Sequence, residues 1–233
     1  MDKLTRLLLV DDDPLLCQVL ADYLQTQGFL VALAHDGESA LAHVAEYACD
    51  LVLLDDTLPG LSALDVLRRI RGQGELAVVM LAAGSDEIDR IVGLEIGADD
   101  YLSKSCHLRE LLARVRSILR RARNARTTER AHGSDLGVLD ISSTERTASW
   151  RGKALRLTST EFKLLELLSA SPGQAVGKAD LAMSVLGREM DRYDRSLDMH
   201  ISNLRKKLGK LADGRSPIQV VRGAGYQLLR KHE

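Results

Sequence analysis

Cysteine is scarce in this sequence. Its 233 residues include 3 cysteines, Cys17, Cys49 and Cys106, and an odd number cannot pair completely within one chain. None of them stands in a C-x-x-C pair or at the cysteine and histidine spacing of a zinc site. The sequence therefore excludes zinc sites of these types and predicts a reducing, cytosolic environment.

Long apolar runs are also missing. Asp11 to Asp13 interrupt the first apolar run, and no later stretch approaches the length of roughly 18 residues that a membrane helix needs. We therefore expect a soluble, cytoplasmic protein without a signal peptide and without membrane insertion.

Net charge is close to zero, at -1, but it is unevenly distributed. Residues 1–120 carry 11 Lys and Arg against 20 Asp and Glu, whereas the remaining residues carry 21 against 13. The acidic half is suited to cation binding or regulation, and the basic half to a polyanion, most commonly nucleic acid. The alternative is a charge gradient that serves no binding function.

Apolar runs and amphipathic segments alternate in the first half of the chain. Five short apolar runs are each followed by a segment of helical length, which predicts a parallel sheet with helices on both faces. Asp13 and Pro14 are typical of the start of a helix, and Gly28 of the end of one. The expected strands cover Arg6–Val10, Phe29–Ala34, Leu51–Leu54, Ala77–Leu81 and Tyr101–Ser103, and the expected helices Pro14–Gln27, Glu38–Tyr47, Leu64–Arg71, Asp86–Ile96 and Leu108–Arg121.

The pattern changes after residue 121. Residues 122–135 lack apolar periodicity and predict an exposed linker between one domain at 1–121 and a second at 136–233. Thr158 and Glu161 predict a capping box at the first helix of the second domain. The expected strands are Leu136–Ile141, Thr147–Trp150 and Ala154–Leu157, the three helices begin near Thr158, Lys178 and Arg195, and a final hairpin pairs Ile218–Val221 with Tyr226–Leu229.

Acidic side chains are predicted to converge at the carboxyl edge of the parallel sheet, where open sheets bind ligands. Asp11 and Asp12 follow the first strand and Asp55 the third, so their carboxylates should repel one another and favour a hard cation such as Mg²⁺. With Lys104 at the end of the fifth strand, this set suits attack of an Asp55 oxygen on a phosphoryl group. The alternative is that each aspartate only caps a helix or a turn.

Four segments carry a resemblance to a known family. LLLVDDDP, DLVLLDDTLPG, DEIDRIVGLEIGADDYLSK and RELLARVRSILRR resemble the receiver domain of the OmpR/PhoB response regulators over the whole first domain. The resemblance implies a doubly wound (βα)5 receiver fold of the flavodoxin/CheY type, Mg²⁺ held by Asp11, Asp12 and the Thr57 carbonyl, and phosphorylation of Asp55 by a sensor histidine kinase. It also implies that Lys104 contacts the phosphate and that the domain is not an enzyme beyond slow self-dephosphorylation.

The family pattern is incomplete. Tyr101 matches the switch aromatic of the family, but Ala82 stands where the family usually has the Thr or Ser hydroxyl that binds the phosphoryl group. Loss of a hydrogen bond to a charged group costs about 1.5 to 3 kcal/mol, enough to reduce a phosphorylation-driven population shift about tenfold or more. Ser105 and Cys106 replace a Pro-Phe pair, and Asp56 adds an acid beside the acceptor. The open alternative is a partly degenerate receiver whose control of DNA binding is independent of phosphorylation.

By the same resemblance, the fourth and fifth helices and the strand between them form a symmetric dimer interface. We expect Arg90 to pair with Glu110, and Asp100 with Arg114, across a two-fold axis. A solvated surface of mixed charge is the alternative. The expected interface residues are Arg90, Glu95, Asp99, Asp100, Glu110, Arg114 and Arg121.

The helix expected from Arg195 to Leu208 has two different sides. An apolar stripe that includes Leu197 and Ile201 predicts packing against a core, while polar and basic side chains on the other side and the flanks can bind bases and phosphates. Without further context, a basic helix exposed to solvent is the alternative.

The final hairpin supplies that context. Its glycine-rich tip is predicted to present Arg222 to a minor groove. LTSTEFKLLELL, DRSLDMHISNLRKKLG and VVRGAGYQL resemble the winged helix-turn-helix domain of the same family, which implies binding to double-stranded DNA, a homodimer on activation and RNA polymerase as a further candidate partner. The expected DNA contacts are Arg195, Ser196, Met199, His200, Ser202, Asn203, Arg205, Lys206, Arg222 and Tyr226.

Two other functions remain open at this point. A Mg²⁺-dependent phosphatase with an aspartyl nucleophile commonly has a second acid two residues later, but Thr57 occupies that position. A DNA-binding protein with a vestigial receiver is kept open by Ala82. Beryllofluoride mimics an acyl phosphate, so a lack of Mg²⁺-dependent binding would favour the vestigial receiver.

Overall fold

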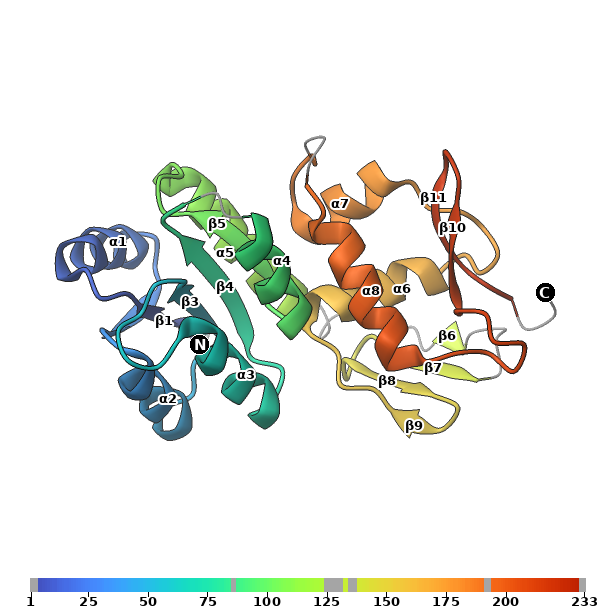
Figure 1. Ribbon diagram of the computed structural model, residues 1–233, viewed down its shortest axis with the longest axis horizontal. Coiled ribbons are helices and arrows are strands. Elements are labelled where there is room, and N and C mark those ends of the chain that lie inside the picture. The colour runs from blue at the N-terminus through green and yellow to red at the C-terminus, as the bar shows by residue number, and fades with distance from the viewer. Residues whose placement is uncertain (1–3, 85–86, 124–131, 134–137, 191–193, 231–233) are drawn as a thin grey trace. The chain divides into compact units, whose positions relative to one another are not determined.

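Two units, Met1–Leu119 and Arg120–Glu233, divide the chain. The computed structural model describes residues 4–84, 87–123, 132–133, 138–190 and 194–230 (Figure 1). Among these residues, no helix is both long and apolar enough to cross a membrane.

The first unit contains a five-stranded sheet in the order β2-β1-β3-β4-β5, in which all neighbouring strands are parallel. This topology confirms the doubly wound fold predicted from the alternating pattern. The strands are β1 (Arg6–Val10), β2 (Leu30–Ala34), β3 (Leu51–Asp55), β4 (Ala77–Ala82) and β5 (Asp100–Ser103), and the helices are α1 (Pro14–Thr26), α2 (Gly37–Glu46), α3 (Ala63–Gln73), α4 (Glu87–Ile96) and α5 (Leu108–Arg123).

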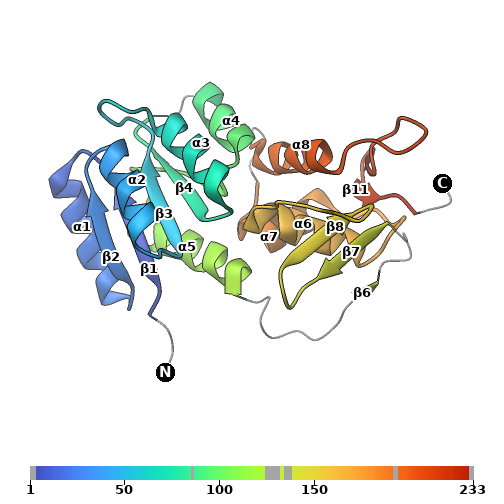
Figure 2. The same cartoon turned by 90° about the horizontal axis from the view of Figure 1, so that it is seen from below.

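Helices cover both faces of this sheet (Figures 1 and 2). Alternate strand residues such as Leu7 and Leu9 belong to one apolar cluster with residues of α1 and α5. The intervening Leu8 and Val10 are equally buried on the other face, where α2, α3 and α4 pack side by side. Since both faces of β1, β3 and β4 are covered, these strands appear in the sequence as continuous apolar runs.

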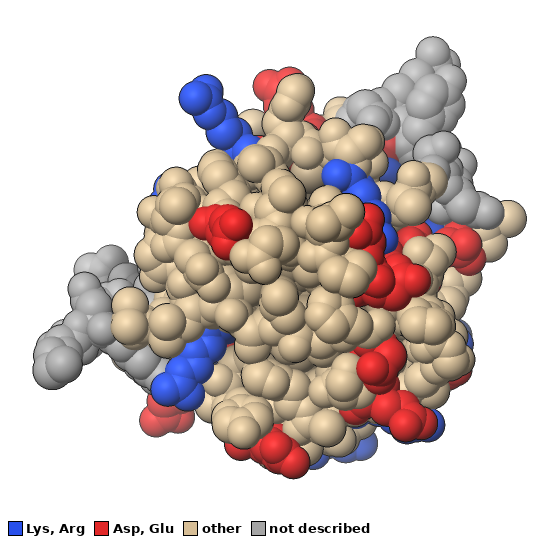
Figure 3. Space-filling view, turned by 90° about the vertical axis from the view of Figure 1, so that its left-hand side faces the viewer, with Lys and Arg blue, Asp and Glu red and all other residues tan. Residues whose placement is uncertain are grey.

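The side of the first unit that carries α1 is largely uncharged. Leu15 and Val19 of α1 are exposed, as is Leu30 of the edge strand β2. α1 lies at the left-hand end of Figure 1, and the view from that side shows charged groups scattered over a mostly uncharged surface (Figure 3).

Helix α1 begins directly at the carboxyl edge of the sheet. The side chain of Asp13 caps it by accepting hydrogen bonds from the backbone N–H groups of Leu15 and Leu16, and Pro14 occupies the first turn, as predicted. This cap fixes the direction of the chain just after Asp11 and Asp12.

In its described residues, the second unit has a four-stranded antiparallel sheet, three helices and a final hairpin. Its apolar core joins all three helices to both sheets. The capping box of Thr158 and Glu161 is present as predicted. The strands are β6 (His132–Gly133), β7 (Leu139–Ser142), β8 (Thr147–Trp150), β9 (Lys153–Ala154), β10 (Ile218–Val221) and β11 (Gly225–Leu228), and the helices are α6 (Ser159–Ser169), α7 (Lys178–Leu186) and α8 (Ser196–Leu208).

One expected strand of this unit needs correction. The strand expected at Ala154–Leu157 ends at Ala154, because the chain leaves the sheet there to reach the cap of α6 at Thr158. The linker expected at 122–135 stays a prediction, because 124–131 and 134–135 lie outside the described residues; its residues 132–133 form the short strand β6, which pairs with β7.

Candidate functional site

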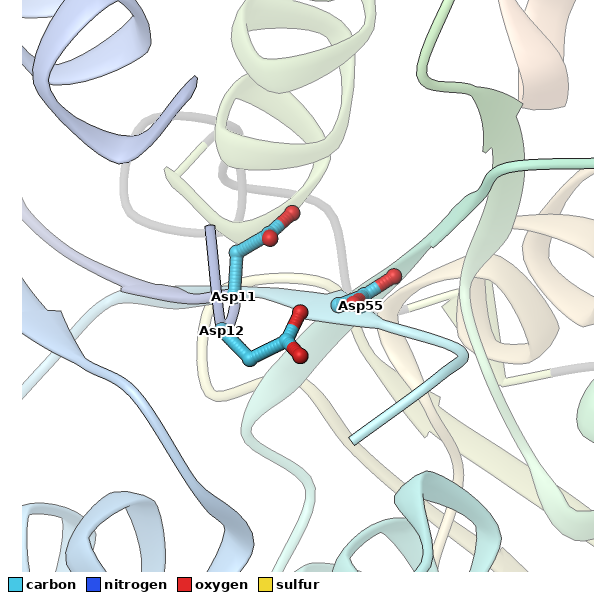
Figure 4. A group of neighbouring side chains, drawn as sticks. All are labelled: Asp11, Asp12 and Asp55. Atoms are coloured by element: carbon cyan, nitrogen blue, oxygen red, sulfur yellow. The ribbon is translucent and has the colours of Figure 1, made fainter. Parts of the chain in front are cut away.

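Three aspartates from two neighbouring strands converge at the carboxyl edge of the first sheet. Asp11 and Asp12 follow β1 and Asp55 ends β3, and each offers an oxygen that lies within 4.8 Å of those of the other two (Figure 4). Asp11 and Asp55 are fully buried, whereas Asp12 is exposed. The pairing of β1 with β3 brings these residues together, as the sequence predicted.

Lys104 binds both buried carboxylates. It follows β5, and its Nζ lies 2.8 Å from Asp11 Oδ2 and 2.7 Å from Asp55 Oδ1. Burial opposes the charge on this lysine, but its hydrogen bonds to Asp55 and Asp11 outweigh that effect and raise the pKa of Lys104 above its ordinary value. The lysine is therefore held in its cationic form beside the predicted acceptor.

Burial raises the pKa of Asp55, and the negative charge of Asp11 adds to this effect, although the hydrogen bond to Lys104 opposes it. Apart from Lys104, no donor among the described residues reaches Asp55 Oδ1 or Asp11 Oδ2. Three carboxylates thus face one ammonium group, and their oxygens are the ligand type that Mg²⁺ prefers. The residues present fit a hard divalent cation.

Thr57 lies on the loop that follows the acceptor. Its hydroxyl donates a hydrogen bond to Asp55 Oδ2 over 3.2 Å, so the second oxygen of the carboxylate is also held in place. The role expected for the Thr57 carbonyl as a metal ligand remains a prediction.

The residue after the acceptor makes a contact that the sequence did not reveal. Tyr101 of β5 donates a hydrogen bond from its hydroxyl to Asp56 Oδ2 over 2.8 Å. Ala82, at the end of β4, is buried at 2% exposure and offers no hydroxyl. The sequence singled out Asp56 only as an extra acid, because nothing in its spacing indicated Tyr101 as a partner.

The residues expected at a dimer interface lie on α4, β5, α5 and the turn before β5. Arg114 contacts Asp100 at 3.7 Å and Glu110 at 3.0 Å within the same chain, so the expected Asp100–Arg114 pair already forms without a partner. Asp99 is fully buried, where it binds Arg71 at 3.0 Å and accepts from the backbone N–H of Val78. Glu95 and Glu110 are exposed and Arg90 is half-buried, while Arg114 and Arg121 are buried at 9% and 7% exposure.

Helix α8 has the predicted apolar stripe. Leu197, Ile201 and Leu204 are fully buried, and Leu208 is 3% exposed, so these residues anchor the helix to the core of the second unit. α8 begins one residue later than expected, with Arg195 as its N-cap residue.

The polar residues of α8 differ in their exposure. Arg195 and Lys206 are exposed, and Met199, Ser202 and Arg205 are half-buried. Ser196, His200 and Asn203 are buried at 1%, 1% and 5% exposure, so the outward exposure expected of Ser196 and Asn203 is not observed. Ser196 donates its backbone N–H to Asp194 and its hydroxyl accepts from Arg188, which explains its low exposure.

Tyr226 of β11 lies in the core of the second unit at 4% exposure. Its hydroxyl donates to Asp198 of α8 over 2.6 Å, and Asp198 also binds Lys178 of α7 over 2.7 Å. The expected contact of Tyr226 with a DNA backbone therefore competes with an internal bond that joins α8 to the hairpin. Arg222 lies at the tip of that hairpin and is exposed, as predicted.

Two family models match the chain. The model of the response regulator receiver domain matches residues 7–116, and that of the transcriptional regulatory protein C terminal matches residues 152–228. The chain therefore belongs to the response regulators that join a receiver to a DNA-binding domain of the OmpR/PhoB type.

Individual relatives match the chain over nearly its full length. CpxR of Escherichia coli K12 is 42% identical over 230 residues, which cover 97% of this chain and 99% of CpxR. BaeR of Escherichia coli O6:H1 is 40% identical over 222 residues, covering 95% and 92%. The crystal structure of DrrB, an OmpR/PhoB homologue from Thermotoga maritima, matches with a TM-score of 0.53 and 29% identity over 97% of this chain and 100% of that chain.

Proposed function

We propose that phosphorylation of Asp55 by a sensor histidine kinase controls the binding of the second domain to duplex DNA. The observation that supports this most directly is the position of Lys104, whose ammonium group lies between two buried carboxylates of a three-aspartate pocket. The same pocket fits Mg²⁺, with Asp11, Asp12, Asp55 and the Thr57 carbonyl as the proposed ligands.

The proposed reaction is a transfer between two side chains. An oxygen of Asp55 attacks the phosphorus of a phosphohistidine on the kinase, a P–O bond forms, and the P–N bond breaks with its electron pair leaving on the imidazole. Lys104 then neutralises an oxygen of the acyl phosphate. Bound Mg²⁺ would supply further positive charge to the phosphoryl oxygens.

In the second domain, a helix and a hairpin are suited to contact different parts of a DNA duplex. The exposed N-cap residue Arg195 and the exposed Lys206 of α8 are suited to phosphates, and exposed Arg222 to a minor groove. Contacts of Ser196 and Asn203 with bases require that these buried side chains become accessible in the DNA complex. A cytoplasmic location, a dimer through α4, β5 and α5, and contact with RNA polymerase belong to the same proposal.

Beryllofluoride tests the receiver directly. We expect it to bind the full chain only when Mg²⁺ is present and to increase dimerisation, measured by sedimentation equilibrium. Asp55→Asn should abolish both effects, whereas Asp65→Asn, at a half-buried position on α3 away from the pocket, should retain them. A wild-type chain that neither binds beryllofluoride nor changes its dimerisation would contradict phosphorylation control and favour a receiver that acts without phosphorylation.

A further inference from the structure

A hydrogen bond connects Asp56, the residue after the proposed acceptor Asp55, with the edge strand β5, two strands away from β3. Asp56 directly follows Asp55, and its Oδ2 accepts from the Tyr101 hydroxyl over 2.8 Å. Asp56 Oδ1 is buried and has no hydrogen-bond partner among the described residues. Among the described residues, the Tyr101 hydroxyl is therefore the side-chain donor that binds the Asp56 carboxylate.

The sheet register shows what this bond spans. Asp55 of β3 lies beside Leu81 of β4, and Met80 of β4 lies beside Tyr101 of β5. The bond from Asp56 to Tyr101 thus joins the strands on either side of β4, near the end where that strand finishes at Ala82. A methyl side chain at position 82 cannot make a hydrogen bond that would connect the same elements.

Tyr101 also reaches helix α4. A Cβ atom placed on Gly93 would lie 3.5 Å from Cε2 of the Tyr101 ring, so the ring already packs closely against this part of α4. Burial and the Asp56 carboxylate raise the pKa of Tyr101, which keeps the phenol protonated as a donor. A continuous chain of contacts therefore runs from the residue after Asp55, through one aromatic ring, to α4.

We propose that Asp56 is a positioning residue that holds Tyr101 in the unmodified receiver and releases it when Asp55 carries a phosphoryl group. This inference rests on the proposed phosphorylation of Asp55. A phosphoryl group adds negative charge on the residue next to Asp56, and like charges on neighbouring residues repel one another. The Asp56–Tyr101 bond thus transmits the state of the acceptor to α4 without a hydroxyl at position 82.

The experiment follows Tyr101 in the full chain labelled with ¹³C at the tyrosine Cζ atoms. Tyr101→Phe assigns its resonance by removing it. We expect Asp56→Ala to shift this resonance in the unmodified chain, and beryllofluoride with Mg²⁺ to shift the wild-type resonance in the same direction. Asp56→Ala should also increase dimerisation of the unmodified chain by about tenfold, the size expected when a hydrogen bond to a charged group is lost.

Asp56→Asn separates the bond from the charge. The amide oxygen can still accept from Tyr101, but it carries no charge for a phosphoryl group to repel. We expect the unmodified Asp56→Asn chain to retain a resonance close to wild type and to respond to beryllofluoride with a much smaller shift. Asp22→Ala, at an exposed position on α1, and Tyr47→Phe, at an exposed tyrosine, are the matched controls and should behave as wild type.

Two results would overturn the inference. If wild type binds beryllofluoride and dimerises while the Tyr101 resonance stays unchanged, the proposed function stands and the coupling through Asp56 is wrong. If Asp56→Ala shifts the resonance but leaves dimerisation unchanged with and without beryllofluoride, the bond is only structural. A wild-type chain that fails to bind beryllofluoride contradicts the proposed function itself, because binding is measured separately from the resonance.

Discussion

The ammonium nitrogen of Lys104 lies 2.7 Å from Oδ1 of Asp55. In the unmodified receiver this lysine compensates the charge of the group that we propose to be phosphorylated. After phosphoryl transfer the same ammonium can bind a phosphoryl oxygen without leaving the pocket. Lys104 therefore stabilises the unmodified site and neutralises negative charge in the phosphorylated one.

Lys104→Met should destabilise the receiver strongly when Mg²⁺ is absent. The substitution leaves Asp11 and Asp55 buried without their cation, and removing one partner of a buried pair typically costs about 3 to 5 kcal/mol of unfolding free energy. Mg²⁺ should recover part of this loss, because a ligand that binds only the folded state stabilises it. Urea unfolding with and without Mg²⁺ measures both effects.

Arg69→Met, at an exposed position on α3, is the control for this measurement and should change the unfolding free energy little in either condition. If Mg²⁺ stabilises neither wild type nor Lys104→Met, the acidic pocket is not its binding site.

Gly225→Ala should disrupt the hairpin of the second unit. Gly225 has φ of 139°, and a Cβ there would collide with the backbone carbonyl of Val176. We expect a loss of about 2 kcal/mol or more, since steric overlap adds to backbone strain. Gly214→Ala is matched in its positive φ of 82° but has no atom within 4 Å of the added Cβ. It should cost about 1 kcal/mol, from strain alone. Equal losses in thermal or urea unfolding would show that the contact with Val176 is unimportant.

Glu166 gives the second unit a defined dependence on pH. Partial burial opposes its ionisation, but hydrogen bonds from Lys163 and Ser143 outweigh this and lower the pKa of Glu166. Because the folded pKa is lower than the ordinary value of 4.5, ionised Glu166 stabilises the fold above pH 4.5. That contribution is lost as the pH falls through the folded pKa. Glu166→Gln should therefore be less stable than wild type near neutral pH, and the difference should shrink as the pH falls below 4.5 and through the folded pKa.

The comparison of unfolding free energies near neutral pH and below pH 4.5 decides this prediction. Glu145→Gln, at an exposed position, is the control and should match wild type at both. A difference between wild type and Glu166→Gln that persists unchanged at low pH would mean that the ion pair with Lys163 is not its origin.

Arg222→Ala and Asn203→Ala should affect DNA binding differently. Loss of the exposed Arg222 should weaken binding to all sequences and reduce the dependence of affinity on salt. The reason is that the protein then has one cation fewer with which to neutralise the phosphates of the duplex. Loss of Asn203 should change the preferred base at one position by about 1 to 3 kcal/mol if this side chain becomes accessible on binding. Mobility-shift titrations on a panel of duplexes at several salt concentrations separate the two effects. Unchanged affinity and unchanged preference in both variants would rule out the proposed docking.

Most of the fold could be predicted from the sequence because it depends on local periodicity. β1, β8 and β10 have the bounds expected from their apolar patterns, and α7 begins at Lys178 as predicted. The acidic pocket was also predictable, since parallel strands that end in aspartate must bring those residues to one edge. β6 was missed because a two-residue strand has no period to detect.

The finer contacts could not be read from the sequence. The bonds of Tyr101 with Asp56 and of Tyr226 with Asp198 join residues that lie far apart in the chain, so their pairing depends on strand order and rotamers. Helical period alone also assigned Asn203 to an exposed side, whereas the structure shows it buried. Helical periodicity predicts only the direction in which a side chain leaves its helix. Whether that side chain is buried also depends on the residues that surround the helix.

The three consecutive aspartates after β1 have different roles and are not interchangeable. Asp11 is buried against Lys104, Asp12 is exposed at the rim, and Asp13 accepts the backbone N–H groups that begin α1. Substitution of any one of them by alanine would leave two acids in the sequence but would remove either the cap of α1 or a carboxylate of the pocket. Mutational tolerance in this segment should therefore follow residue order and not acidic content.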